Sequence, residues 1–168
     1  MKNKKIIITS IVIVLFTLLI VWRLWKKDVY DMINMDKKEI KHISVVIVKP
    51  EVSDGKSRHI TYYLKSNSNE KEFDKIFSVL EKSKFRSSFL NLLPEGVGQA
   101  DSSKNNIKYS ASISLYDKKE SSINNISFVE ENKVMVSSYD ENKVYYTTNK
   151  KILEMLYNYV SKYGEKED

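Results

Sequence analysis

The feature that most constrains this chain is an uninterrupted apolar run close to its N-terminus. From Ile6 to Trp22 there is no charged residue, no proline and no glycine. As an α-helix, these 17 residues would extend over about 26 Å, close to the roughly 30 Å of a bilayer's hydrocarbon core. Leu24 and Trp25 lengthen the stretch if Arg23 extends towards the headgroups. The run predicts a transmembrane anchor over residues 6–25.

The residues that flank the run fit this interpretation. The chain's two tryptophans lie where an interfacial aromatic belt is expected, with basic residues beside them. A cleaved signal peptide is the main alternative, since Lys2, Lys4 and Lys5 precede the apolar stretch, but no small-x-small cleavage site follows it. We therefore expect an uncleaved, single-pass signal-anchor in the cell membrane. The expected interfacial residues are Trp22, Arg23, Trp25, Lys26 and Lys27.

The orientation of the expected anchor in the membrane follows less directly from the sequence, because basic residues flank both ends of the run. A basic start before an N-terminal apolar segment is what export machinery normally reads. This favours an N-terminus inside the cell and an extracytoplasmic C-terminal domain.

The charge distribution argues against a nucleic-acid partner. The net charge is +6, but six of the 28 basic residues and none of the acidic ones lie in the first 27 positions. From Asp28 onwards, 22 basic residues balance 22 acidic residues. The basic excess thus belongs to the flanks of the apolar run, where it suits anionic lipid headgroups, and the rest of the chain lacks the net basicity of a nucleic-acid-binding domain.

Sequence patterns divide the chain into five segments. They are a basic tail (1–5), the anchor (6–25), a stalk or juxtamembrane segment (26–39), a single α+β domain (40–164) and a charged tail (165–168). Strands are expected at about 40–49 and 58–65 as a hairpin, at 85–93, and at 106–115, 122–130, 133–139 and 143–147 as a meander.

Two helices complete the predicted domain. Asn69 and Glu72 form a capping-box pattern before Phe73, Ile76, Phe77 and Leu80, which share one helical face. A last helix begins at Thr148 or Asn149 and ends at Gly164. The predicted fold is α+β: an N-terminal transmembrane helix, then an antiparallel, meander-like sheet with two packed helices.

No motif for catalysis or cofactor binding stands out. There is no cysteine, and the two histidines, His42 and His59, lie on the first two predicted strands without a nearby carboxylate motif. Gly55-Lys56-Ser57 resembles the end of a phosphate-binding loop, but Pro50 replaces the glycine that should precede it. We expect no enzyme activity, no metal and no cofactor.

Tyrosine is the one unusual component. All 11 tyrosines lie beyond the apolar run. Tyr62-Tyr63 and Tyr145-Tyr146 place rings on both faces of their strands, which offers a surface for a glycan or a protein partner. The simpler interpretation is that tyrosine fits half-exposed strand positions.

The segments DKKEIKHISVVIV and NEKEFDKIFSVLEKSK, with the serine- and tyrosine-rich strands and helix that close the chain, resemble small extracytoplasmic domains of unknown function in Gram-positive bacteria. The leading hypothesis is a non-enzymatic envelope module, held at the membrane by its anchor, that binds a protein, peptide or glycan. An accessory or immunity-type protein that acts on a membrane partner through its transmembrane helix is the alternative. An envelope hydrolase is the third.

Overall fold

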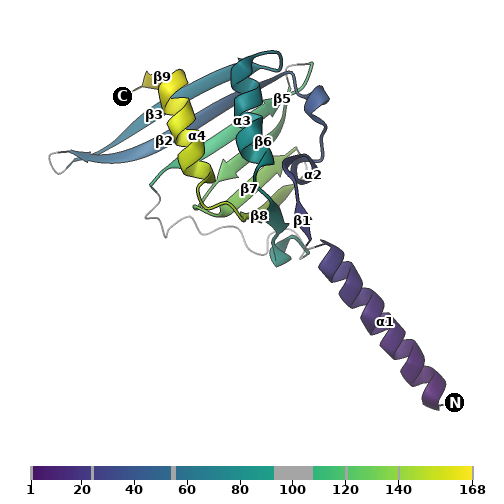
Figure 1. The fold of residues 1–168 in the computed structure, drawn as a ribbon. Helices are drawn as coiled ribbons and strands as arrows, with labels where there is room; N and C mark the ends of the chain where they lie inside the picture. The colour runs from purple at the N-terminus through teal and green to yellow at the C-terminus, as the bar shows by residue number, and fades with distance from the viewer. Residues whose placement is uncertain are drawn as a thin grey trace.

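The computed structural model describes residues 2–23, 25–53, 56–92, 108–119, 121–139 and 141–167 (Figure 1). Across these residues the chain forms four α-helices, two short 3-10 helices and one antiparallel sheet of nine strands. The helices are α1 (Lys2–Arg23), α2 (Val29–Ile33), η1 (Lys37–Glu39), α3 (Lys71–Glu81), η2 (Phe89–Leu92) and α4 (Ile152–Tyr163). The strands are β1 (Lys26–Lys27), β2 (His42–Ser53), β3 (Lys56–Asn67), β4 (Phe85–Ser87), β5 (Ser110–Tyr116), β6 (Ser122–Phe128), β7 (Lys133–Ser138), β8 (Asn142–Thr147) and β9 (Glu165–Glu167).

The apolar run forms α1, which extends away from the sheet (Figure 1). Among the described residues, no helix combines the length and apolar character needed to cross a membrane. The predicted transmembrane anchor at 6–25, the single-pass signal-anchor and the cell-membrane location with an extracytoplasmic domain are therefore wrong.

The predicted fold class is corrected with them. The described chain is mostly sheet, with nine antiparallel strands and four α-helices, and none of these described helices is a membrane span.

The strand order is β1-β4-β8-β7-β6-β5-β2-β3-β9. The predicted hairpin is confirmed as β2–β3, which pairs from His42↔Asn67 outwards and reaches well past the point where β5 stops pairing with β2, at Val48↔Ser110. The short strands β1 and β9 form the two edges, so segments from the two ends of the described chain close opposite sides of the sheet.

Strict alternation gives the sheet two different faces. On β5, Ala111, Ile113 and Leu115 are buried, whereas the serines between them are exposed or half-buried. Successive side chains of a strand point to opposite faces, so this pattern places the apolar residues on the core side.

Helices α3 and α4 cover the core side of the sheet (Figure 1). The spacing of Phe73, Ile76, Phe77 and Leu80 puts four side chains on one face of α3, and all four are fully buried. Burial of each such side chain contributes about 1.5–3 kcal/mol. Ile152, Leu156 and Val160 of α4 are buried in the same core.

The segment expected to be a stalk is part of this core. Asp28 caps α2 by accepting a hydrogen bond from the Asp31 amide at 2.9 Å. The helix buries Val29, Met32 and Ile33, each at most 3 % exposed. A stalk boundary at 39 therefore differs from the structure, in which the packed fold begins with β1 and α2.

Two buried side chains fasten α2 to the sheet. Asn124 Nδ2 donates to the Ile33 carbonyl at 3.1 Å, and the Tyr145 hydroxyl donates to the Met32 carbonyl at 3.5 Å. They satisfy backbone carbonyls at the end of a short helix, where intrahelical partners are lacking.

Gly164 ends α4 through a close approach. A Cβ at this position would lie 2.4 Å from the Tyr63 carbonyl oxygen and 2.7 Å from the Val160 carbonyl oxygen. Its backbone is extended, with φ −89° and ψ 172°, so the left-handed cap that a glycine here suggests is not the reason for it. The close approach lets β9 pair with β3 immediately after the helix, which differs from the expected charged tail at 165–168.

Candidate functional site

On the side of the sheet opposite α3 and α4, strands β2, β5, β6 and β7 carry no described α-helix, and the chemistry of this surface is unusual. Paired positions follow one another across β2, β5, β6 and β7, for example Val46↔Ser112↔Ser127↔Met135. We call the central part of this surface the serine face. Its residues are Ser44, Val46, Val48, Ser110, Ser112, Ser114, Asn125, Ser127, Met135 and Ser137.

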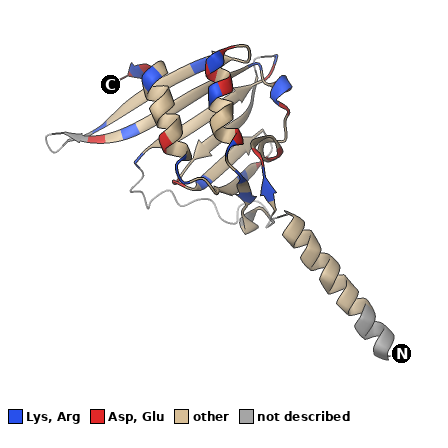
Figure 2. Cartoon of the chain, in the orientation of Figure 1, with Lys and Arg blue, Asp and Glu red and all other residues tan. Residues whose placement is uncertain are grey.

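The serine face carries no formal charge. None of its described residues on β2, β5 or β6 is Lys, Arg, Asp or Glu, and in Figure 2 both β5 and β6 are tan along their length. A solvated sheet face normally carries charged side chains, whereas the central part of a protein interface is depleted of them. This depletion distinguishes the serine face from an ordinary solvated surface.

A hydrogen-bonded network fixes the middle of the serine face. Asn125 Oδ1 accepts hydrogen bonds from Ser112 Oγ at 3.0 Å and from Ser127 Oγ at 2.7 Å. Asn125 Nδ2 donates to Ser114 Oγ at 3.1 Å. These bonds restrict the rotamers of four short side chains, so a partner would lose little side-chain entropy by contacting them.

Tyrosines and charges border the serine face. Tyr63 on β3 and Tyr146 on β8 point to this side and are 40 % and 38 % exposed. Lys65 on β3 and Lys133 on β7 lie on the same side. An uncharged centre with an aromatic and charged border is the usual anatomy of a protein interface.

The four tyrosines predicted as a binding surface are not brought together. Tyr62 points to the helix side, where its ring meets Tyr157 edge-on at 5.7 Å, and burial raises its pKa. Tyr145 is buried and bound to the Met32 carbonyl. Tyr63 and Tyr146 share the uncovered side but are separated by five inter-strand spacings, about 24 Å.

The residues expected at a membrane interface have different roles. Lys26 and Lys27 form β1 and pair with Arg86 and Phe85 of β4. Trp22 and Trp25 are 74 % and 67 % exposed. The side chain of Arg23 lies outside the described residues.

The two histidines do not form a pair. His42 stacks on Tyr116 with 4.3 Å between ring centroids, whereas His59 is exposed on the projecting part of the β2–β3 hairpin, opposite Pro50. Among the described residues no group of three or more His, Asp or Glu side chains could hold a metal ion.

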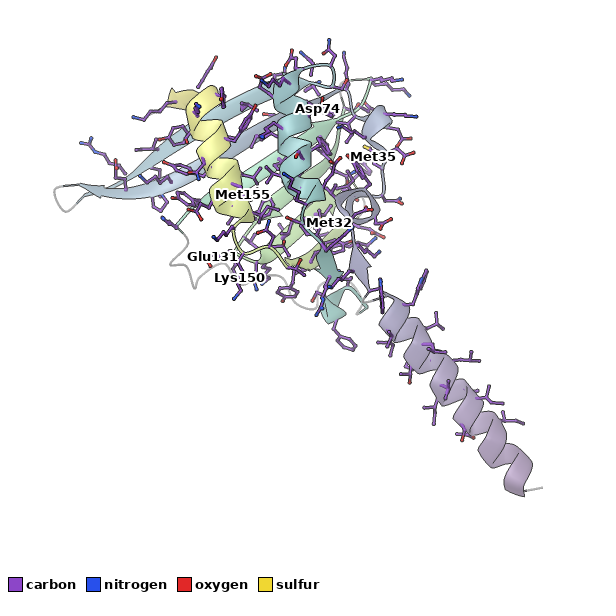
Figure 3. The ribbon with its side chains drawn as sticks, in the orientation of Figure 1. Met32, Met35, Asp74, Glu131, Lys150 and Met155 are labelled. Carbon is purple, nitrogen blue, oxygen red and sulfur yellow. The ribbon has the colours of Figure 1, made fainter. Side chains whose placement is uncertain are left out.

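Two hollows are weaker candidates than the serine face. The first, of about 150 Å³, lies beside the start of α4 and includes Glu131 and Lys150, labelled in Figure 3. It is smaller than the 300–1,000 Å³ of typical ligand pockets. The lining residues are Lys108, Tyr109, Glu131, Lys150, Leu153 and Glu154.

The second hollow is a shallow groove of about 820 Å³ along α2 and η1 (Figure 3). Its carboxylates have local structural roles. Asp28 accepts from the Asp31 amide, and Glu39 accepts from the Asp36 amide at 3.0 Å. The acidic character of this groove is thus explained by helix capping.

Comparisons with protein-family models, with curated proteins and with solved structures find no match to this chain. The resemblance to extracytoplasmic domains of Gram-positive bacteria gains no support from them.

The serine face has a signal in the sequence, although no catalytic motif marks it. Ser110, Ser112 and Ser114 alternate with apolar residues, and no charge interrupts them. Alternation identifies the strand, and the unbroken series of hydroxyls marks its outward side as uncharged.

Proposed function

We propose that the protein is a non-enzymatic binding module that holds a protein partner on the serine face. The observation that carries the proposal is the absence of charge from the centre of a sheet face that no described helix covers. An uncharged surface of this kind is retained at a cost in solubility when it contacts a partner.

The dimensions favour a protein that binds reversibly. From β3 to β8 the face is about 24 Å wide, and seven strand residues extend about 23 Å, which gives an area of about 550 Å². A standard interface buries about 800 Å² on each partner, and transient complexes bury less than about 600 Å². We therefore expect a partner that associates and dissociates readily.

A glycan is a poorer fit than a protein. Sugar recognition usually relies on stacking against closely spaced aromatic rings, and the two exposed tyrosines are about 24 Å apart. The low relief of Ser112, Ser127 and Val46 between them instead suits the flat surface of a folded protein.

Site-specific photocrosslinking in the full chain tests the proposal. A photoreactive amino acid replaces Ser112 or Met135 on the serine face, and Lys75 of α3 or Asn158 of α4 on the opposite side of the molecule. All four positions are exposed or half-buried, so the fold should tolerate the changes. In cells that contain the protein naturally, we expect one adduct of defined mass from Ser112 and Met135, and none from Lys75 or Asn158.

Two variants sharpen this test. Ser112→Arg places a charge at the centre of the face and should lower the adduct yield from position 135 by at least tenfold, because a charge buried there would be unpaired. Asn158→Arg on α4 is the matched control and should leave the yield unchanged. Equal adducts from all four positions, no adduct, or an adduct formed by two copies of this chain would each refute the proposal of a distinct protein partner.

A further inference from the structure

A line of basic side chains borders the serine face on the side of β1. Lys133 pairs with Tyr146, Tyr146 pairs with Arg86, and Arg86 pairs with Lys26. Directly paired residues point to the same face of a sheet, so these four side chains form one row across β7, β8, β4 and β1. We call it the basic row. It covers three inter-strand spacings, about 14 Å.

The cations of the basic row are unevenly compensated. Lys133 is only 15 % exposed, and its ammonium group lies 3.5 Å from a carboxylate oxygen of Glu130. Arg86 and Lys26 are exposed and directly opposite each other, and no ion pair joins either of them to another described residue. Like charges at directly opposite positions destabilise a strand pair.

Protection of a sheet edge explains only part of this arrangement. Lysines on an exposed edge strand discourage pairing with other chains, and this accounts for Lys26 and Lys27 on β1. It does not account for Arg86, which lies one strand further in, on β4. An anionic group bound between Arg86 and Lys26 would relieve their repulsion.

The basic row is continuous with the serine face. Lys133 and Met135 lie two residues apart on β7 and therefore point to the same side. A partner seated on the serine face would reach Lys133 first and then Tyr146 and Arg86. The row is thus placed to contact the same partner at the border of its interface.

We propose that the basic row binds carboxylates of an acidic segment of the protein partner, an inference that rests on the proposed function. The Arg86 guanidinium matches a carboxylate in bidentate geometry. Lys26 supplies a second charge, and the Tyr146 hydroxyl supplies a neutral donor. Carboxylates are favoured over a nucleic acid because residues from Asp28 onwards have no net charge, whereas a nucleic-acid site requires a broad basic surface.

A binding assay with the full chain tests this inference. The probe is a fluorescent decaglutamate peptide, compared with decaglutamine and with a single-stranded DNA of ten nucleotides, by anisotropy at low and high salt. We expect decaglutamate to bind, decaglutamine not to bind, and the affinity to fall as salt screens the charges. The double variant Lys26→Gln/Arg86→Gln should bind decaglutamate roughly three- to tenfold more weakly.

The matched control is the double variant Lys118→Gln/Lys119→Gln. These lysines are exposed in the turn between β5 and β6, beyond Tyr116 and at the opposite end of β5 from Ser110, and their loss removes the same charge. The control should bind decaglutamate as the natural chain does. An equal loss in both double variants, no loss in either, or tighter binding of the DNA with the same dependence on Arg86 would overturn the inference.

The two proposals fail in different ways. If the Ser112 adduct persists while decaglutamate does not bind, the serine face remains supported and the basic row is refuted as a carboxylate site. If decaglutamate binds but Ser112 and Met135 give no specific adduct, the proposed function is refuted. The basic row is then a carboxylate site, but its ligand is not a segment of a partner bound on the serine face.

Discussion

The packing of α2 against the sheet leads to a sharp prediction about where the folded unit begins. A fragment of residues 38–168 lacks Val29, Met32 and Ile33, each at most 3 % exposed. Loss of three such side chains costs about 5–9 kcal/mol. Asn124 and Tyr145 would also lose their carbonyl acceptors, at about 1–3 kcal/mol for each unpaired group.

The sum, about 7–15 kcal/mol, is comparable to the entire stability of a typical domain, about 5–15 kcal/mol. We therefore expect fragment 38–168 to lack a cooperative urea transition and dispersed amide resonances. Fragment 26–168 retains α2 and loses residues 1–25, and the described large apolar side chains of α1 are exposed apart from the half-buried Ile20. It should unfold cooperatively. A cooperative transition of similar midpoint in both fragments would refute the argument.

Three further predictions concern single residues. Gly164→Ala forces a Cβ to within 2.4 Å of a backbone oxygen. We therefore expect the free energy of unfolding in urea to fall by about 1–3 kcal/mol and amide exchange in β9 to become faster. An unchanged urea midpoint would contradict the close approach. The side chain and amide of Asn67 hold the pKa of Glu70 below its ordinary value of 4.5, so this group contributes stability above about pH 4.5 that is lost as pH falls through the lower folded value. The Glu70→Gln variant should then lose less stability than the natural chain between about pH 5 and pH 3. An equal loss in both proteins would show that Glu70 does not contribute in this way. Burial and a hydrogen bond to Glu81 raise the pKa of Tyr30 above 10.0, so the folded state keeps the tyrosine proton and loses stability as pH rises past that value. Tyr30→Phe should lower the free energy of unfolding by about 0.5–1.5 kcal/mol at neutral pH and abolish this alkaline loss. Chemical denaturation at neutral pH and above pH 10.0 measures both effects.

The parts of the fold that sequence patterns identified are those with long, regular periods. The spacing of Phe73, Ile76, Phe77 and Leu80 located α3 to within two residues, and alternation located β5. Both patterns reflect burial of one side of an element, which acts over many residues.

Sequence patterns did not identify the short elements, because these elements depend on contacts with residues far along the chain. Nothing in Lys26-Lys27 indicates a strand, and pairing with β4, nearly 60 positions later, makes it one. The predicted strand at 85–93 ends at Ser87 because Asn91 binds the Val144 backbone with its side chain, at 2.6 and 2.8 Å, in place of a strand's backbone. Local propensity carries no information about such partners.

The candidate site could also be predicted only in part from the sequence. Neighbouring residues of a strand point to opposite faces, so Tyr62-Tyr63 and Tyr145-Tyr146 were bound to be divided between two surfaces. Which of those surfaces the helices would cover depends on the chain's path through space. The serine face depends on the order in which β7, β6, β5 and β2 lie side by side in the sheet, which local sequence patterns do not give.

The strand order also determines when the sheet can be completed during synthesis. Next to one edge, β4 pairs with β8, about 60 residues further along the chain, and at the other edge β3 pairs with β9, at about residue 165. At about 5–20 residues per second, several seconds separate the emergence of β3 from the ribosome and that of β9. Throughout that interval the outer backbone of β3 offers hydrogen bonds that no later segment has yet taken. The nascent chain is therefore most vulnerable to mispairing along β3, and a ribosome-associated chaperone that shields this strand should raise the yield of native protein more than one that acts after release.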